Sequence, residues 1–230
     1  MQLTRHPPIV AIDGPSGSGK GTISRRLAAA TGWHLLDSGA LYRLVALAGQ
    51  QAGLDREDEP GHALVARTML VEFGSTASGA EKVLLEGSDV TAAIRTETAG
   101  EGASRVAAWP SVREALLGRQ RRFVEPPGLV ADGRDMGTTV FPAAELKVFL
   151  TASSTERAAR RYKQLKDKGL DVSLAALSRE IALRDERDTS RKVSPLAAAP
   201  DARIIDSTGL TIDQVVAAVL DLGRQRALWE

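Results

Sequence analysis

Residues 9–22 read IVAIDGPSGSGKGT, and this stretch decides the fold. Its first four residues form an apolar run that is typical of a buried strand. A loop with three glycines follows, and Lys20 then opens a helical pattern. Glycines let backbone N–H groups turn inward around phosphate oxygens, and the positive end of the next helix favours the same anion. The stretch therefore predicts a phosphate-binding loop between a strand and a helix.

The end of this loop indicates how a nucleoside triphosphate would be held. Lys20 is placed to reach the β- and γ-phosphates with its positive charge. Gly21 stands where the general pattern has serine or threonine, so direct metal ligation by the Thr22 hydroxyl is left open. We expect ATP as co-substrate and Mg²⁺ carried mainly by ATP and water, with no side chain assigned as a metal ligand. The residues expected to bind ATP are Gly14, Pro15, Ser16, Gly17, Ser18, Gly19, Lys20, Gly21 and Thr22.

Outward from the loop, short apolar runs alternate with helical patterns along the chain. Strands are expected at 8–13, 33–36, 128–132, 146–150 and 202–206. Helices are expected at about 20–31, 38–51, 110–124, 154–168, 173–189 and 211–228. This alternation predicts the α/β class, with a five-stranded parallel sheet and helices on both faces. Ligands of such a sheet bind at the carboxyl ends of its strands.

One segment, from about 59 to 95, interrupts the alternation. Val71–Phe73 and Lys82–Glu86 flank Gly74–Ala80, which is rich in serine, glycine and alanine. Two short strands around such a turn predict a small antiparallel hairpin inserted into the main fold.

Composition excludes several classes of function. The chain has 30 Lys+Arg against 29 Asp+Glu, so its charge favours neither a nucleic-acid nor a membrane partner. It has no cysteine, which excludes disulfides and thiolate metal sites. The first residues lack the apolar core of a signal peptide, so we expect a cytoplasmic protein. No apolar stripe indicates a dimer, and a monomer is expected.

Four later segments carry arginine beside acidic or small residues. They read LDSGALYR at 36–43, ASRVAAWPSVR at 103–113, DGRDMGT at 132–138 and RDERDTSR at 184–191. An acceptor that itself bears a phosphate needs guanidinium groups facing the phosphate loop, because arginine binds phosphate bidentately and keeps its charge. The segments therefore favour a nucleotide acceptor over an alcohol without phosphate.

Together with the phosphate loop, these segments resemble the bacterial cytidylate kinases, in the same order and from Ile9 to about Arg226. The resemblance implies a P-loop kinase that transfers the γ-phosphoryl group of ATP to CMP or dCMP, giving CDP or dCDP and ADP. It also implies a single kinase domain over residues 1–230. That domain would contain an inserted monophosphate-binding subdomain at about 59–95 and a short lid region at about 155–191.

The resemblance also implies roles for individual side chains. Those expected on the monophosphate or the transferring phosphoryl group are Arg43, Arg113, Arg134, Arg184 and Arg191. Those expected to read the cytosine base are Ser38, Ser104, Arg113 and Asp135, and Asp188 is expected on the ribose hydroxyls. The expected catalytic residues are Lys20, Arg134, Arg184 and Arg191. No general base is needed, because the attacking oxygen belongs to an ionised phosphate.

Other functions on the same scaffold stay open at this point. Adenylate kinase is disfavoured because the segment between the helices near Lys168 and Ser173 is too short for a large lid. Uridylate is harder to separate, since the two pyrimidines differ at one edge, but an acceptor such as Asp135 suits the cytosine amino group. A protein that senses nucleotide without turnover would leave the arginine segments unexplained.

Overall fold

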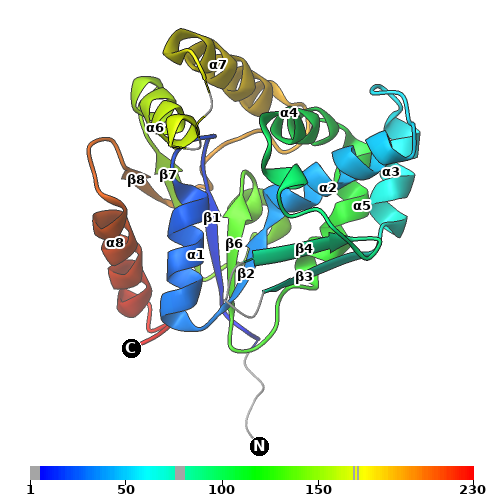
Figure 1. Ribbon diagram of the computed structural model, residues 1–230. Coiled ribbons are helices and arrows are strands. Elements are labelled where there is room, and N and C mark those ends of the chain that lie inside the picture. The colour runs from blue at the N-terminus through cyan, green and yellow to red at the C-terminus, as the bar shows by residue number, and fades with distance from the viewer. Residues whose placement is uncertain (1–5, 76–80, 168, 170) are drawn as a thin grey trace, which may run out of the picture. The chain divides into compact units, whose positions relative to one another are not determined.

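The computed structural model describes residues 6–75, 81–167, 169 and 171–230 (Figure 1). The chain divides into two compact units. The first runs to Asp37 and resumes from Arg121 to Glu230, and the second is Ser38–Gln120. Within the described ranges, no helix is both long enough and apolar enough to cross a bilayer.

The first unit is built on a five-stranded parallel sheet. Its strands are β1 (Ile9–Asp13), β2 (His34–Asp37), β6 (Leu129–Gly133), β7 (Leu146–Thr151) and β8 (Arg203–Asp206), in the order β2-β6-β1-β7-β8. All residues of β1 and β6 are buried, as expected for central strands covered on both faces. The five strands predicted from the apolar runs are confirmed.

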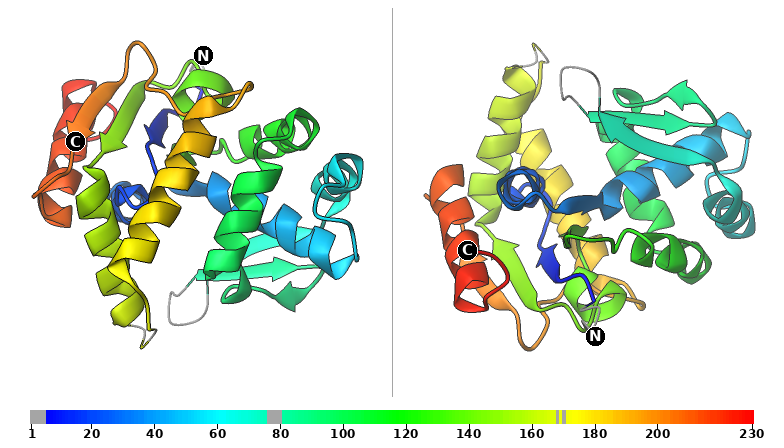
Figure 2. Two further views of the ribbon diagram at one scale, coloured as in Figure 1. Left: turned by 90° about the horizontal axis from the view of Figure 1, so that it is seen from above. Right: turned by 90° about the horizontal axis from the view of Figure 1, so that it is seen from below.

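Four helices belong to this unit: α1 (Lys20–Thr31), α6 (Ser154–Lys166), α7 (Leu174–Ser190) and α8 (Ile212–Gln225). Helices α1 and α8 lie side by side against the sheet, and α6 packs against α7 (Figures 1 and 2). The core beneath α1 and α8 is mainly aliphatic and also includes Trp33. It contains Val10, Ile12, Ile23, Leu27, Val130, Leu146, Val148, Leu150, Val215 and Val219. The predicted α/β class is confirmed.

The second unit contains four helices and a small antiparallel sheet. The helices are α2 (Ser38–Gln51), α3 (Glu59–Thr68), α4 (Glu97–Val106) and α5 (Pro110–Arg121), with a short turn of 3₁₀ helix, η1, at Ala93–Arg95. Helix α2 packs against both α3 and α4. The sequence patterns had predicted α2 and α5 but neither α3 nor α4, and α5 ends three residues before its predicted end.

The predicted hairpin is confirmed and has a third strand. Strand β3 (Val71–Ser75) pairs antiparallel with β4 (Glu81–Leu85), with Val71 opposite Leu85. Strand β5, only Ser88–Asp89, extends the sheet beyond β4. Most of the predicted turn, residues 76–80, lies outside the described residues.

Candidate active site

The phosphate loop occupies residues 14–19, between the end of β1 and the start of α1. Gly14 has φ +154°, and a Cβ there would lie 2.0 Å from the Leu150 carbonyl oxygen. Gly17 and Gly19 also have positive φ, at 78° and 92°. Only glycine adopts this sequence of conformations without strain. Helix α1 begins at its Gly19 N-cap with no side-chain cap, so its first N–H groups are left for an anion.

The carbonyl groups of the loop are held by side chains from later in the chain. Arg157 of α6 donates to the Ser16 carbonyl oxygen at 3.0 Å, and Arg160 donates to that of Ser18 at 3.4 Å. The Ser207 hydroxyl donates to the same Ser18 oxygen at 3.3 Å. These bonds fix the carbonyl side of the loop, so that backbone amides form its ligand side.

Arg157 also connects the loop to α7. Its two terminal nitrogens bind the two carboxylate oxygens of Asp185 at 3.0 and 2.5 Å. The side chain is almost fully buried, and its Nε donates to the Ala152 carbonyl oxygen. The Asp185 side chain is partly exposed, but a bidentate pair of this kind has a fixed geometry. Helix α7, which carries Arg184 and Asp188, is therefore connected to the phosphate loop through Arg157.

Lys20 lies folded against the phosphate loop. Its Nζ donates to the Pro15 carbonyl oxygen at 3.0 Å, and the residue is 8% exposed. An ammonium has three donors, and no second acceptor for Lys20 is found among the described residues. Burial lowers its pKa to about 7, and the nearby charges of Arg134 and Arg184 contribute to this shift. The carboxylates of Asp132 and Asp188 act in the opposite direction, and the remaining donors of the ammonium can bind an anionic ligand.

Asp132 is the penultimate residue of the neighbouring strand β6 and lies beside the start of α1. Strand β6 pairs with both β1 and β2, and Asp132 stands opposite Asp37 in that register. A Cβ on Gly21 would lie 3.2 Å from Asp132 Oδ2, which explains why glycine replaces the usual serine or threonine there. Burial raises the pKa of Asp132 to about 6, although Lys20 acts in the opposite direction. No role for Asp132 was predicted from the sequence. The available signal was an acidic residue near the carboxyl end of a buried strand, where ligands bind.

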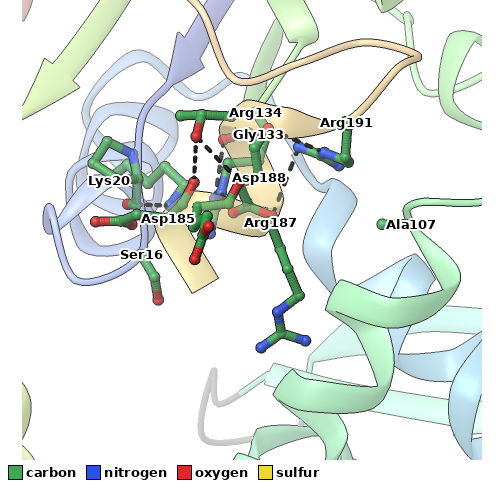
Figure 3. Close-up of polar contacts among 12 residues, drawn as sticks. Ser16, Lys20, Ala107, Gly133, Arg134, Asp185, Arg187, Asp188 and Arg191 are labelled. Carbon is green, nitrogen blue, oxygen red and sulfur yellow. Dashed lines mark hydrogen bonds and ion pairs between the residues drawn. The ribbon is translucent and has the colours of Figure 1, made fainter. Parts of the chain in front are cut away.

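Arg134 and Arg191 both contact Asp188 (Figure 3). Arg134 Nε donates to Asp188 Oδ2 at 3.0 Å, and Arg191 Nε donates to the Asp188 carbonyl oxygen at 3.2 Å. Burial opposes ionisation of Asp188, but Arg134, Arg191 and Arg184 together hold its pKa below the usual range. The single negative charge of Asp188 therefore attracts three guanidinium groups.

Asp135 follows Arg134 and is buried at the start of η2 (Met136–Val140), a single turn of π-helix. Its carbonyl oxygen accepts the N–H groups of Thr139 and Val140 at 2.9 and 3.1 Å. The backbone of the turn after β6 is thus closed on itself directly after Arg134. Thr22, half-buried in the first turn of α1, is close in sequence to Lys20.

The remaining predicted residues, Ser38, Arg43, Ser104 and Arg113, lie in the second unit. Ser38 begins α2, and Arg43 one turn later donates to the Ile94 carbonyl oxygen at 2.7 Å. Ser104 is buried on α4, which packs on α2. Arg113 of α5 is buried, donates to the Ala107 carbonyl oxygen at 3.2 Å, and places its guanidinium 5.7 Å from the centre of the Tyr42 ring. These four predicted residues therefore stand on three helices of this unit, α2, α4 and α5.

Tyr42 was not predicted as part of this group. Its ring lies under the Arg113 guanidinium, a cation–π geometry that orients the charge. The sequence signal was its place directly before Arg43.

Comparison with known proteins identifies the family of this chain. The family model described as cytidylate kinase matches residues 10–225. A protein named cytidylate kinase from Azotobacter vinelandii is 58% identical over 95% of this chain and 96% of its own length. Proteins of the same name from Pseudomonas syringae pv. tomato and Aeromonas salmonicida are 60% and 55% identical, over 93% and 95% of this chain and 93% and 95% of their own lengths. The chain belongs to the cytidylate kinase family.

Proposed function

We propose that this protein is a (d)CMP kinase, which transfers the γ-phosphoryl group of ATP to CMP or dCMP. One observation carries the proposal. Lys20, Arg134 and Arg184 lie close enough that the two guanidinium charges help to lower the pKa of the lysine. The carboxylates of Asp132 and Asp188 offset these three cations only in part, so the site favours a further anion, which is the arrangement that phosphoryl transfer requires.

The chain's own residues perform the binding and charge neutralisation in this proposal. The loop amides and the start of α1 hold the ATP phosphates, and Lys20 contacts the β- and γ-phosphates. Arg134, Arg184 and Arg191 stabilise the negative charge on the transferring group. The acceptor phosphate is already ionised, so no side chain has to remove a proton.

Mg²⁺, when bound with ATP, would supply charge neutralisation for the phosphate groups. Among the described residues, no three His, Cys, Asp or Glu side chains gather as a metal site. We therefore infer that ATP and water supply most of its ligands. Asp132, at the strand end beside Gly21, and the Thr22 hydroxyl are the groups we propose to contact its water shell.

For the acceptor, we propose the roles that the family resemblance implies. Arg43 and Arg113 hold the acceptor monophosphate, and Asp188 contacts the ribose. The residues proposed to read the cytosine base are Ser38, Ser104, Arg113 and Asp135. We also propose that residues 155–191 act as the lid and that residues 59–95 serve monophosphate binding within one kinase domain.

The acceptor preference tests this proposal directly. ADP release is measured with ATP and Mg²⁺, using CMP, dCMP, UMP, AMP and dTMP in turn. We expect fast turnover with CMP and dCMP, weak turnover with UMP and none with AMP. Fast turnover with another acceptor would overturn the base-reading roles, and no turnover with any acceptor would favour a nucleotide sensor.

A variant of Asp135 tests the base-reading role within the same assay. A carboxylate accepts from the cytosine amino group, whereas the amide of Asp135→Asn can also donate to the uracil carbonyl. The ratio of UMP to CMP turnover is therefore expected to rise in the variant. An unchanged ratio would show that Asp135 does not contact the base.

Nucleotide binding is also expected to take up a proton at pH 8. With a pKa of about 7, Lys20 is mostly neutral at this pH, and phosphate oxygens beside it would raise the pKa and restore its charge. Calorimetric titration with ATP in two buffers of different ionisation enthalpy measures the uptake, expected to approach about one proton. Lys20→Arg keeps its charge throughout. Equal uptake by the two proteins would contradict the prediction.

A further inference from the structure

Asp13 is a buried carboxylate to which neither the sequence patterns nor the proposed mechanism gives a role. It is the last residue of β1, directly before Gly14, and is 4% exposed. Its Oδ1 accepts the Met136 N–H and its Oδ2 accepts the Gly137 N–H, each at 2.8 Å. Both oxygens are therefore used by two consecutive amides, 123 and 124 residues later in the chain.

These two bonds need a carboxylate. An ionised carboxyl group accepts with both oxygens and donates with neither, which matches two converging N–H groups. An asparagine of the same shape would direct its NH₂ group at one of them. Among the residues that the structure describes, no cation pairs with this carboxylate, so its burial is unfavourable. Burial raises the pKa of Asp13 to about 6, and the charges of Asp135 and Asp132 contribute to this shift. Packing alone does not explain why a buried carboxylate stands at this position.

The amides that Asp13 binds lie directly after Arg134 and Asp135. They begin η2, whose N-cap is Asp135. Gly137 is confined on both sides, because an added Cβ would lie 3.4 Å from Asp13 Oδ2 and 3.1 Å from Lys147 Cδ. Lys147 is itself held by the Pro142 carbonyl oxygen at 2.7 Å and by Asp201 at 2.9 Å. The turn after β6 thus rests between a fixed lysine and the Asp13 carboxylate.

Asp13 connects the two halves of the chemistry within one unit. Along the chain it leads directly into the phosphate loop, and across the β1–β6 pair it stands opposite Gly133. Its side chain then continues to the amides beyond Arg134. A displacement of Asp13 would therefore change the position of Arg134 relative to Lys20 without removing either side chain.

We propose that Asp13 is a positioning residue for phosphoryl transfer, which fixes the turn carrying Arg134 and Asp135 against the strand that leads into the phosphate loop. The inference rests on the proposed kinase function. It assigns Asp13 no contact with substrate. Since catalytic groups must be held to within a fraction of an ångström, a small shift of Arg134 lowers the rate while the loop still binds ATP.

The test is Asp13→Asn, assayed as the full chain with ATP and CMP. We expect kcat to fall about 10²-fold, the scale of a catalytic group misplaced by about 1 Å. The KM for CMP should rise, while the Kd for ATP should stay within about threefold, because the loop glycines and Lys20 are unchanged. Asp58→Asn is the matched control. Asp58 also accepts a backbone N–H, that of Gly61 at 2.9 Å, at the start of α3, where asparagine caps equally well.

A double-mutant cycle with Arg134→Ala separates positioning from other roles. If Asp13 acts through Arg134, then Asp13→Asn should lower kcat much less in the Arg134→Ala background than in the parent chain. Additive losses would overturn the inference. A loss of ATP affinity larger than the effect on kcat would assign Asp13 to the loop instead. A lower melting temperature with normal kcat per folded molecule would make its role structural.

A second variant covers failure of Asp13→Asn to fold. Gly137→Ala leaves the carboxylate in place and presses the same turn against Lys147, because its Cβ would lie 3.1 Å from Lys147 Cδ and in ordinary contact, at 3.4 Å, with Asp13 Oδ2. As with Asp13→Asn, we expect a lower kcat with unchanged ATP affinity, but the fall in kcat should be only severalfold. An unchanged kcat would count against the inference. The parent chain is assayed first with all five acceptors. Absence of CMP turnover there refutes the proposed substrate, and the variants are then compared on the acceptor that is used.

Discussion

A Lys20→Ala variant is expected to turn over ATP and CMP about 10²- to 10³-fold more slowly than the parent chain, as when one charge-stabilising donor is removed from other active sites. The phosphate loop would keep its amides and its glycine geometry, so ATP would still bind. It would lose the one ammonium that lies against the loop at the Pro15 carbonyl oxygen. Steady-state kinetics with saturating ATP and CMP measure the loss.

Lys20→Ala is expected to keep or raise the folding stability, although it lowers the turnover. The pKa of Lys20 is lowered in the folded state from 10.5 to about 7, so the unfolded chain binds more protons between these values. The unfavourable contribution of the buried lysine is therefore fully present below pH 7 and fades as the pH rises towards 10.5. Lys20→Ala is expected to unfold at the same or a higher temperature at pH 7. Lys163→Ala, an exposed lysine on α6, is the control. A parallel loss of activity and stability would refute the catalytic role.

Arg134→Ala is expected to lower kcat about 10³-fold, the lower end of what an arginine on a transferring phosphoryl group contributes. Its guanidinium is held by Asp188 Oδ2 at 3.0 Å and by the Gly133 carbonyl oxygen at 3.2 Å. The Arg134 guanidinium is therefore already oriented before the reaction, and no reorganisation is needed during it. Arg134→Lys should recover only part of the rate, because an ammonium cannot bind phosphate as a planar fork.

The ion pair of Arg134 with Asp188 requires its own control. Arg224→Ala removes a guanidinium from an exposed pair with Asp221, at 2.8 Å on α8, where such pairs contribute about 0–1 kcal/mol. Its kcat should match the parent chain. If Arg134→Ala keeps its kcat and loses only stability, then Arg134 is part of a structural ion pair and the proposed clamp is wrong.

The sequence allowed most of the first unit to be predicted. Its strands are continuous apolar runs, and its loop is marked by glycines and Lys20, so local pattern and tertiary structure agree. The sequence does carry a start signal for helix α3, because Asp58 caps this helix and Pro60 stands in its first turn. Helix α4 carried a weaker signal, its Thr96 N-cap followed by Glu97, because Gly100 and Gly102 lower its helix propensity. Packing on α2 supports this helix.

The candidate site was predictable as a set of residue types but not as a set of contacts. Arginine beside aspartate at a strand end indicated a phosphate site, yet nothing local indicated that Asp188 binds Arg134 from 54 residues away. The same holds for Asp13, which binds the backbone amides of Met136 and Gly137, 123 and 124 residues later in the chain. Burial and long-range register decide such pairs, and neither is visible in a short motif.

The contact between α2 and α4 has a consequence for protein engineering. A Cβ on Gly102 would lie 2.9 Å from the Ala46 Cβ, so the backbones of these helices meet with no room for one more methyl group. Ser38, Arg43 and Ser104 stand on those two helices, and their spacing is therefore set by main chain rather than by adjustable side chains. A library that seeks a new acceptor base should keep positions 46 and 102 constant and vary the side chains at the helix ends.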